Sequence, residues 1–121
     1  MSDVPYRVDK PWGYELIWAR TDRYVGKVLH VKKGESLSLQ YHNVKDETIL
    51  LQSGRLLFET RPAGQDGDLR QVDMKPGDVF HITPGTLHRM TAVEDCDIVE
   101  VSTPELDDVV RLEDRYGRQG T

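Results

Sequence analysis

The sequence predicts an all-β domain in which short strands close into a barrel or jelly roll. Short apolar runs recur along the chain, and turns containing Gly or Pro separate them at regular intervals. The chain has only two Phe and two Trp, so its core must be built largely from Val and Leu, as is usual for strands. At 121 residues it is long enough to bury one core, and we assign residues 1–121 to a single domain.

The composition is that of an ordered protein outside the nucleic-acid-binding and membrane classes. Hydrophobic residues make up 37% and charged residues 31% of the chain, and the net charge of −5 argues against a nucleic-acid partner. Cys96 is the single cysteine, which excludes an internal disulfide and suits a reducing compartment. The first residues lack a signal-peptide pattern, and no apolar run approaches the roughly 20 residues that span a bilayer. We therefore expect a cytoplasmic protein that makes no membrane contact.

The first part of the chain predicts an arm followed by two strands. Residues 1–11 are polar and contain two prolines, which favours an extended arm. A turn at Pro11-Trp12-Gly13 leads into a strand at Tyr14–Trp18. Tyr24–Lys32 is apolar on both faces, so we expect this strand in the interior of a sheet.

The remaining strands are short and evenly spaced. Ser53-Gly54 predicts a hairpin turn between two of them, and the polar, glycine-containing residues 61–68 predict an exposed loop. Strands are expected at Thr48–Gln52, Leu56–Thr60, Leu69–Met74, Asp78–Ile82, Leu87–Val93 and Ile98–Val101.

The end of the chain favours a short helix over residues 103–116. Thr103 is a suitable N-cap, Pro104 suits the first helical position, and acidic residues load the first turn. Apolar residues recur at helical spacing from Leu106 to Val110.

A candidate metal site begins on the strand that follows Gly34. Strict alternation from Ser36 to His42 places Gln40 and His42 on one face, two residues apart. Glu47 lies far enough along the chain for a turn and the start of the next strand. Side chains from adjacent strands can converge on one divalent cation.

His88 is a fourth candidate ligand, delivered by turns at Pro76-Gly77-Asp78 and Pro84-Gly85. Two imidazoles, one carboxylate and one amide oxygen suit a single divalent transition metal: Zn, Mn, Fe or Ni. The alternative is that these groups bind nothing and satisfy one another, but burying all four at one barrel mouth is costly without a ligand. We predict a metal site formed by Gln40, His42, Glu47 and His88.

These residues resemble the two sequence motifs of the cupin superfamily. Similar to the first motif are Gly34, Gln40-x-His42, Glu47 and Gly54, with Gln40 in place of the first histidine. Similar to the second are Gly77, Gly85 and His88, with Pro84 one position later than usual. The resemblance implies a small jelly-roll barrel whose motif strands face each other across a cavity.

A narrower resemblance covers nearly the whole chain. The sequence is similar to the cupin domain that ends type II mannose-6-phosphate isomerases, which we expect here in standalone form. Lys45 stands where that family usually has arginine, and Ile49 replaces a common aromatic residue. The matching segments are Pro11–Glu15, Leu37–His42, Glu47, Pro84–Arg89 and Leu112–Arg118.

This resemblance implies a metal-dependent aldose–ketose isomerase that acts on a sugar or sugar phosphate. Such a reaction needs a group that stabilises the substrate oxygen, a base that carries a proton between C1 and C2, and exclusion of bulk water. The metal would meet the first need. Glu100 is a candidate for the base, with Glu47 and His81 behind it, and the sequence does not choose among them.

Arg89 and Lys45 are candidates for substrate binding, and Arg89 also for catalysis. The resemblance favours a functional role for Arg89, whereas strand alternation directs it away from the face of His88. Lysine is a point charge rather than a bidentate fork, so phosphate recognition by Lys45 would be looser than by arginine.

Two other functions stay open. His42, Glu47 and His88 also match the two-histidine, one-carboxylate set of non-haem iron oxygenases. The second is a sugar-binding or regulatory cupin without turnover. We expect a homodimer, because the extended N-terminal arm with Trp12, Tyr14 and Leu16 has more apolar surface than a lone edge strand should expose.

Overall fold

Eleven short strands make up the described part of the chain, residues 3–118, which contains no helix. The computed structural model describes these residues, and positions 1–2 and 119–121 of the predicted domain lie outside them. Accordingly, nothing within residues 3–118 forms a helix that could cross a membrane. The strands are β1 Tyr6–Lys10, β2 Gly13–Arg20, β3 Val25–Val31, β4 Leu39–Tyr41, β5 Glu47–Ser53, β6 Leu56–Arg61, β7 Arg70–Met74, β8 Val79–Ile82, β9 Leu87–Ala92, β10 Cys96–Ser102 and β11 Val110–Glu113.

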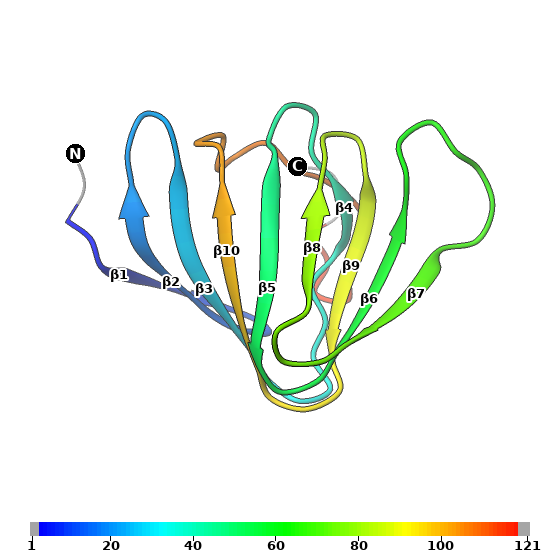
Figure 1. Cartoon of the computed structure of the whole chain (residues 1–121), viewed down its shortest axis with the longest axis horizontal. Coiled ribbons are helices and arrows are strands. Elements are labelled where there is room, and N and C mark those ends of the chain that lie inside the picture. The colour runs from blue at the N-terminus through cyan, green and yellow to red at the C-terminus, as the bar shows by residue number, and fades with distance from the viewer. Residues whose placement is uncertain (1–2, 119–121) are drawn as a thin grey trace.

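The strands form two antiparallel sheets, as expected for a jelly roll. The six-stranded sheet has the order β1-β2-β3-β10-β5-β8, and the five-stranded sheet has the order β11-β4-β9-β6-β7. In Figure 1 the strands of both sheets converge towards the lower end of the view and spread apart above it. The all-β prediction is confirmed.

The predicted strands between Tyr14 and Val101 correspond to β2, β3 and β5 to β10. Their ends differ from the observed ends by two residues or fewer. The expected interior strand, β3, lies between β2 and β10. Period-two alternation and turn residues therefore locate most of this fold.

The N-terminal segment is better described as an edge strand than as an arm. Tyr6–Lys10 pairs with β2 from Tyr6 opposite Ile17 to Lys10 opposite Gly13. Trp12, which the dimer expectation counted as exposed, is 2% exposed and belongs to the core.

The predicted helix over residues 103–116 is wrong, because the chain makes turns there and then enters β11. The oxygen of Thr103 accepts a hydrogen bond from the backbone N–H of Asp46 instead of capping a helix. The Asp108 carboxylate accepts from the backbone N–H groups of Val44 and Lys45. The residues whose types suggested a helix start therefore hydrogen-bond the loop before β5, and β11 pairs with β4.

The predicted hairpin at Ser53-Gly54 is also wrong, since β5 and β6 belong to different sheets. Gly54 turns the chain from one sheet to the other with a φ of 91°. A Cβ at this position would lie 2.1 Å from the carbonyl oxygen of Asp95, so only glycine fits.

The inward residues change from apolar to charged along each central strand of the six-stranded sheet. On β10, Ile98 faces the core and Glu100 follows it on the same face. On the antiparallel neighbour β3, Leu29 faces the core, and Lys27, two residues earlier, lies on the same face opposite Glu100. One end of the barrel is therefore a packed apolar core, and the other holds buried charges.

Candidate metal centre

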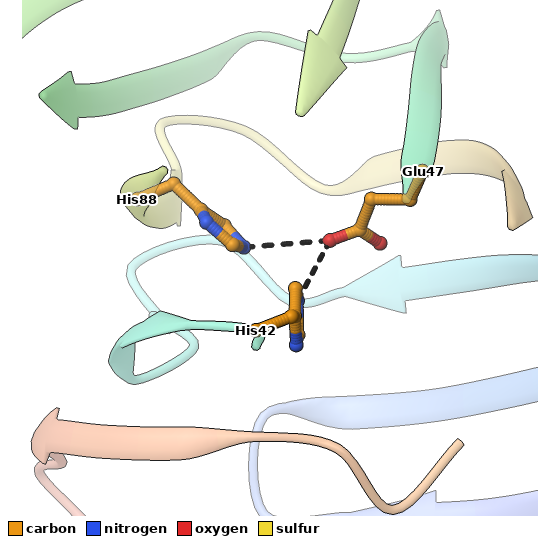
Figure 2. Close-up of side chains that lie close together, drawn as sticks. All are labelled: His42, Glu47 and His88. Atoms are coloured by element: carbon orange, nitrogen blue, oxygen red, sulfur yellow. Dashed lines mark hydrogen bonds and ion pairs between the residues drawn. The ribbon is translucent and has the colours of Figure 1, made fainter. Parts of the chain in front are cut away.

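Three buried side chains from three segments meet at the charged end of the barrel. His42 follows β4, Glu47 begins β5 and His88 lies on β9, and none is more than 3% exposed. Figure 2 shows the three side chains pointing at one another. Glu47 Oε1 lies 2.8 Å from His42 Nε2 and 3.5 Å from His88 Nε2. One ligand atom from each residue lies within 4.8 Å of the others.

Backbone carbonyls fix the proton positions on both imidazole rings. His42 Nδ1 lies 2.6 Å from the carbonyl oxygen of Asp108, and His88 Nδ1 lies 3.0 Å from that of Thr86. A carbonyl oxygen only accepts, so each Nδ1 carries the proton and donates it. When such a ring is neutral, its Nε2 carries the lone pair that can bind a metal.

The chemistry of this donor set fits a metal ion. His42 Nε2 hydrogen-bonds Glu47 Oε1, and His88 Nε2 also faces this oxygen, so the three candidate ligand atoms converge on the same space. His88 Nε2 is buried and has no hydrogen-bond partner among the described residues. A buried acceptor without a donor is costly, and a cation satisfies all three atoms at once. His42, Glu47 and His88 could therefore hold a metal ion.

The protonation states also favour metal binding. Burial would raise the pKa of Glu47, but the hydrogen bond with His42 and the charge of Lys45 outweigh it and lower that pKa to about 2. Burial lowers the pKa of His88 to about 4. At neutral pH the site thus offers a carboxylate and a neutral imidazole, which are the forms that bind metals.

A buried ionic network lies beside the three ligand candidates. Lys45 Nζ is 3.4 Å from Glu47 Oε2 and 3.2 Å from Glu100 Oε2. Lys27 Nζ approaches Glu100 from the other side, at 3.8 Å. Burial opposes the charge on Lys45, but the two carboxylates outweigh it and raise the lysine pKa. Burial, followed by the Glu47 charge, raises the pKa of Glu100.

A cavity of about 90 Å³ opens beside these groups. Gln40 lines it together with His42, Glu47 and Glu100. Gln40 lies directly opposite His88 in the sheet register, and its Oε1 accepts a hydrogen bond from Ser38. The apolar part of the wall comes from Trp12, Leu29, Leu37, Met90, Leu106 and Val109.

Of the other residues predicted to form the site, the structure places two beside the metal-ligand candidates and two away from them. Glu100 and Lys45 lie in the ionic network beside the ligand candidates, although Lys45 already forms ion pairs with two carboxylates. His81 instead faces solvent, where its Nε2 bonds Asp46 at 2.7 Å, because it shares the outer face of β8 with Val79 while Ile82 faces inward. Arg89 pairs with Glu59 on the face of β9 opposite His88, as strand alternation indicated.

Sequence analysis missed several charged residues of the cavity, among them Lys27 and Arg111. Lys27 shares the inward face of β3 with Leu29, so a lysine within an otherwise apolar alternation was the available signal. Arg111 was assigned to the helix, and no local pattern connects it with Gln40, its partner across the β4–β11 register.

The cupin domain family matches residues 27–102, a stretch that includes His42, Glu47 and His88. The chain belongs to the cupin family. This match confirms the predicted fold class and the resemblance of the sequence to the cupin superfamily.

Curated proteins and solved structures agree with this assignment. Mannose-1-phosphate guanylyltransferase of Escherichia coli (strain K12) is 37% identical over 121 residues, covering 95% of this chain and 24% of that protein. The chain spans about a quarter of the length of the curated relatives it matches.

Two solved structures show the same fold. KdgF from Halomonas sp. has a TM-score of 0.72 and 21% identity, covering 84% of this chain and 88% of that one. Oxalate decarboxylase from Bacillus subtilis has a TM-score of 0.76 and 15% identity, covering 90% and 30%. At these identities the likeness concerns the fold alone.

Proposed function

We propose that this cupin is a cytoplasmic, metal-dependent aldose–ketose isomerase that acts on a sugar or sugar phosphate. The observation that carries the proposal is the buried group of His42, Glu47 and His88, with Glu100 lining a cavity beside His42 and Glu47. The resemblance to the cupin domain of type II mannose-6-phosphate isomerases supports the reaction. The name of the E. coli relative includes a phosphorylated mannose, which supports the substrate class.

His42, Glu47 and His88 would hold the metal, with Gln40 as a further ligand from the adjacent position of the sheet. A bound divalent metal would polarise the carbonyl oxygen of the substrate. The backbone carbonyls of Asp108 and Thr86 hold the two imidazole rings in the required orientation.

Glu100 is the proposed base. Its carboxylate removes a proton from the carbon beside the substrate carbonyl and returns it to the former carbonyl carbon. The hydroxyl proton of the neighbouring carbon is transferred to the former carbonyl oxygen, so the reaction balances without a further reactant. Burial raises the pKa of Glu100, which strengthens it as a proton acceptor. Lys27 and Lys45 hold the carboxylate in place and compensate its charge.

The apolar wall of the cavity would keep bulk water from the reacting carbons. Trp12 and Met90 are each 2% exposed, and both line the cavity. A closed site of this kind strengthens the electrostatic interactions within it.

The test is an assay of mannose 6-phosphate conversion to fructose 6-phosphate by metal-loaded protein. Glu100→Gln keeps the size of the side chain but removes the base, so turnover should fall by about a hundredfold or more while metal content is retained. Glu94→Gln, on the loop before β10, is the matched control and should behave as the parent. A metal-loaded parent that converts no aldose or ketose would overturn the proposal.

The composition of the cluster supports a second candidate, a non-haem iron oxygenase. Among the described residues, the group of histidines and carboxylates that could hold a metal consists of two histidines and one carboxylate. Oxygen consumption by the Fe(II)-loaded protein would favour this function. A sugar that raises the melting temperature without forming product would instead indicate a binding protein.

A further inference from the structure

Three cationic side chains stand at the margin of the cavity, outside the buried network. Lys10 ends β1, Arg111 lies on β11, and Arg118 comes near the end of the described chain. Arg118 is neutralised by Asp114, with Nε 2.8 Å from Oδ2 and a second nitrogen 3.1 Å from Oδ1. Among residues 3–118, no carboxylate forms an ion pair with Lys10 or Arg111.

Arg111 is the most informative of these residues. Its Nε is buried, and within residues 3–118 it makes no hydrogen bond or ion pair. Burial, together with the nearby charge of Arg118, lowers its pKa and outweighs the opposing charges of Asp114 and Glu15. A buried guanidinium nitrogen without an acceptor is costly, and an anion would satisfy it.

The sheet register places Arg111 in line with His88 of the candidate metal centre. Arg111 lies opposite Gln40, and Gln40 lies opposite His88. Residues directly opposite in antiparallel strands share a face, so the three form a row across the inner face of the five-stranded sheet. Two strand spacings separate the backbones of Arg111 and His88, a distance of about 10 Å.

Lys10 supplies a second free cation from the other sheet. It is half-buried, lines the same cavity and makes no ion pair within residues 3–118. Lys45, by contrast, is neutralised by Glu47 and Glu100. In a protein of net charge −5, two cations on facing sheets that line one cavity and form no ion pair within residues 3–118 favour an anion there.

We propose that Arg111 and Lys10 form an anion subsite that binds the phosphate monoester end of the substrate. Guanidinium binds phosphate through two parallel hydrogen bonds, and the ammonium adds a point charge. Because Arg111 and His88 lie in one row, a molecule held by its phosphate at Arg111 extends along Gln40 towards the metal ligands. This inference rests on the proposed function and assigns the substrate a phosphate.

The test measures binding of inorganic phosphate by titration calorimetry at low salt. The parent should bind phosphate, and Arg111→Gln should weaken binding by about tenfold or more because a charge-assisted bidentate contact is lost. Lys10→Gln should weaken it less. Arg55→Gln, which removes an exposed arginine paired with Asp73, is the matched control and should bind phosphate as the parent does. Equal phosphate affinity in the parent and in Arg111→Gln would overturn the proposal.

A measurement on the parent protein covers the case in which Arg111→Gln does not fold. Phenylglyoxal modifies arginines, and peptide mass spectrometry locates each modified residue. Phosphate should slow modification of Arg111 and leave the rate at Arg55 unchanged. No protection of Arg111 at saturating phosphate would count against the subsite.

These results separate the subsite from the isomerase proposal. Loss of phosphate binding in Arg111→Gln, in a protein that converts no sugar, would support the subsite and reject the isomerase. Turnover of a sugar phosphate with the same KM in the parent and in Arg111→Gln would support the isomerase and reject the subsite. Metal content should equal that of the parent in every variant, since Arg111 and Lys10 are not ligands.

Discussion

At the scale of single residues, His88 and Gln40 should contribute unequally to metal binding. An imidazole nitrogen binds transition metals more strongly than an amide oxygen does. His88→Ala should therefore abolish bound metal, whereas Gln40→Ala should only weaken it. Elemental analysis of the purified variants measures both effects.

His81→Ala is the control for this pair, because His81 bonds Asp46 outside the cavity. It should hold as much metal as the parent. If His88→Ala and its counterpart His42→Ala also retain the metal content of the parent, the assigned site is wrong.

His88 should also make stability depend on pH. Burial lowers its pKa to about 4, below the ordinary value of 6.5. Between these values the unfolded chain binds a proton that the folded chain does not, so the free energy of unfolding falls as pH drops from 6.5 towards 4. The loss between pH 7 and pH 5 should be about 2 kcal/mol. Urea unfolding in the presence of a chelator measures it.

Glu47 does not obscure this measurement. Its pKa is lowered to about 2 from 4.5, so its contribution is complete above pH 4.5 and is lost only below that value. His88→Gln lacks the titrating ring and should lose less stability between pH 7 and pH 5. An equal loss in the parent and the variant would show that His88 is not the cause.

At the scale of elements, the turn between β5 and β6 should be far less tolerant than the loop between β6 and β7. Gly54→Ala would hold an alanine at a φ of 91° and place its Cβ 2.1 Å from the Asp95 carbonyl oxygen. It should lower the free energy of unfolding by more than about 3 kcal/mol. Gly64→Ala has a φ of 75° and nothing within 4 Å, so it should cost about 1 kcal/mol. Thermal unfolding compares the two variants, and equal costs would contradict the close approach at Asp95.

At the scale of the whole molecule, we propose a homodimer through the outer face of the six-stranded sheet. Trp18, Leu50, Val79 and Val101 are exposed by 37–59%, and they project from β2, β5, β8 and β10 of that sheet. A second copy would cover this apolar surface. Light scattering at micromolar concentration should give twice the monomer mass of 13.9 kDa.

Val79→Lys should weaken the dimer because it places a charge in the apolar surface. Val44→Lys is the matched control, since Val44 is 63% exposed on the loop before β5. A parent mass near 13.9 kDa would refute the dimer.

The sequence by itself determined most strands and the residues that meet at the candidate site. Alternation is a local property: the pleat places Gln40 on one face whatever the rest of the chain does, and Gly54 marks a turn wherever that turn leads. Candidate ligands separated by 46 positions, His42 and His88, were found because imidazoles are distinctive groups beside recognisable turns.

Only the tertiary structure decided the conformation of residues 103–116 and the contacts of the charged side chains at the cavity. Residues 103–116 have helix-cap chemistry, but Thr103 and Asp108 bond backbone groups of residues 44–46, and β11 pairs with β4. Lys45 meets Glu100, 55 positions away, and Arg111 meets no carboxylate within residues 3–118. Local propensity differs by only about 1 kcal/mol between states, so long-range hydrogen bonds and sheet pairing decide between helix and strand.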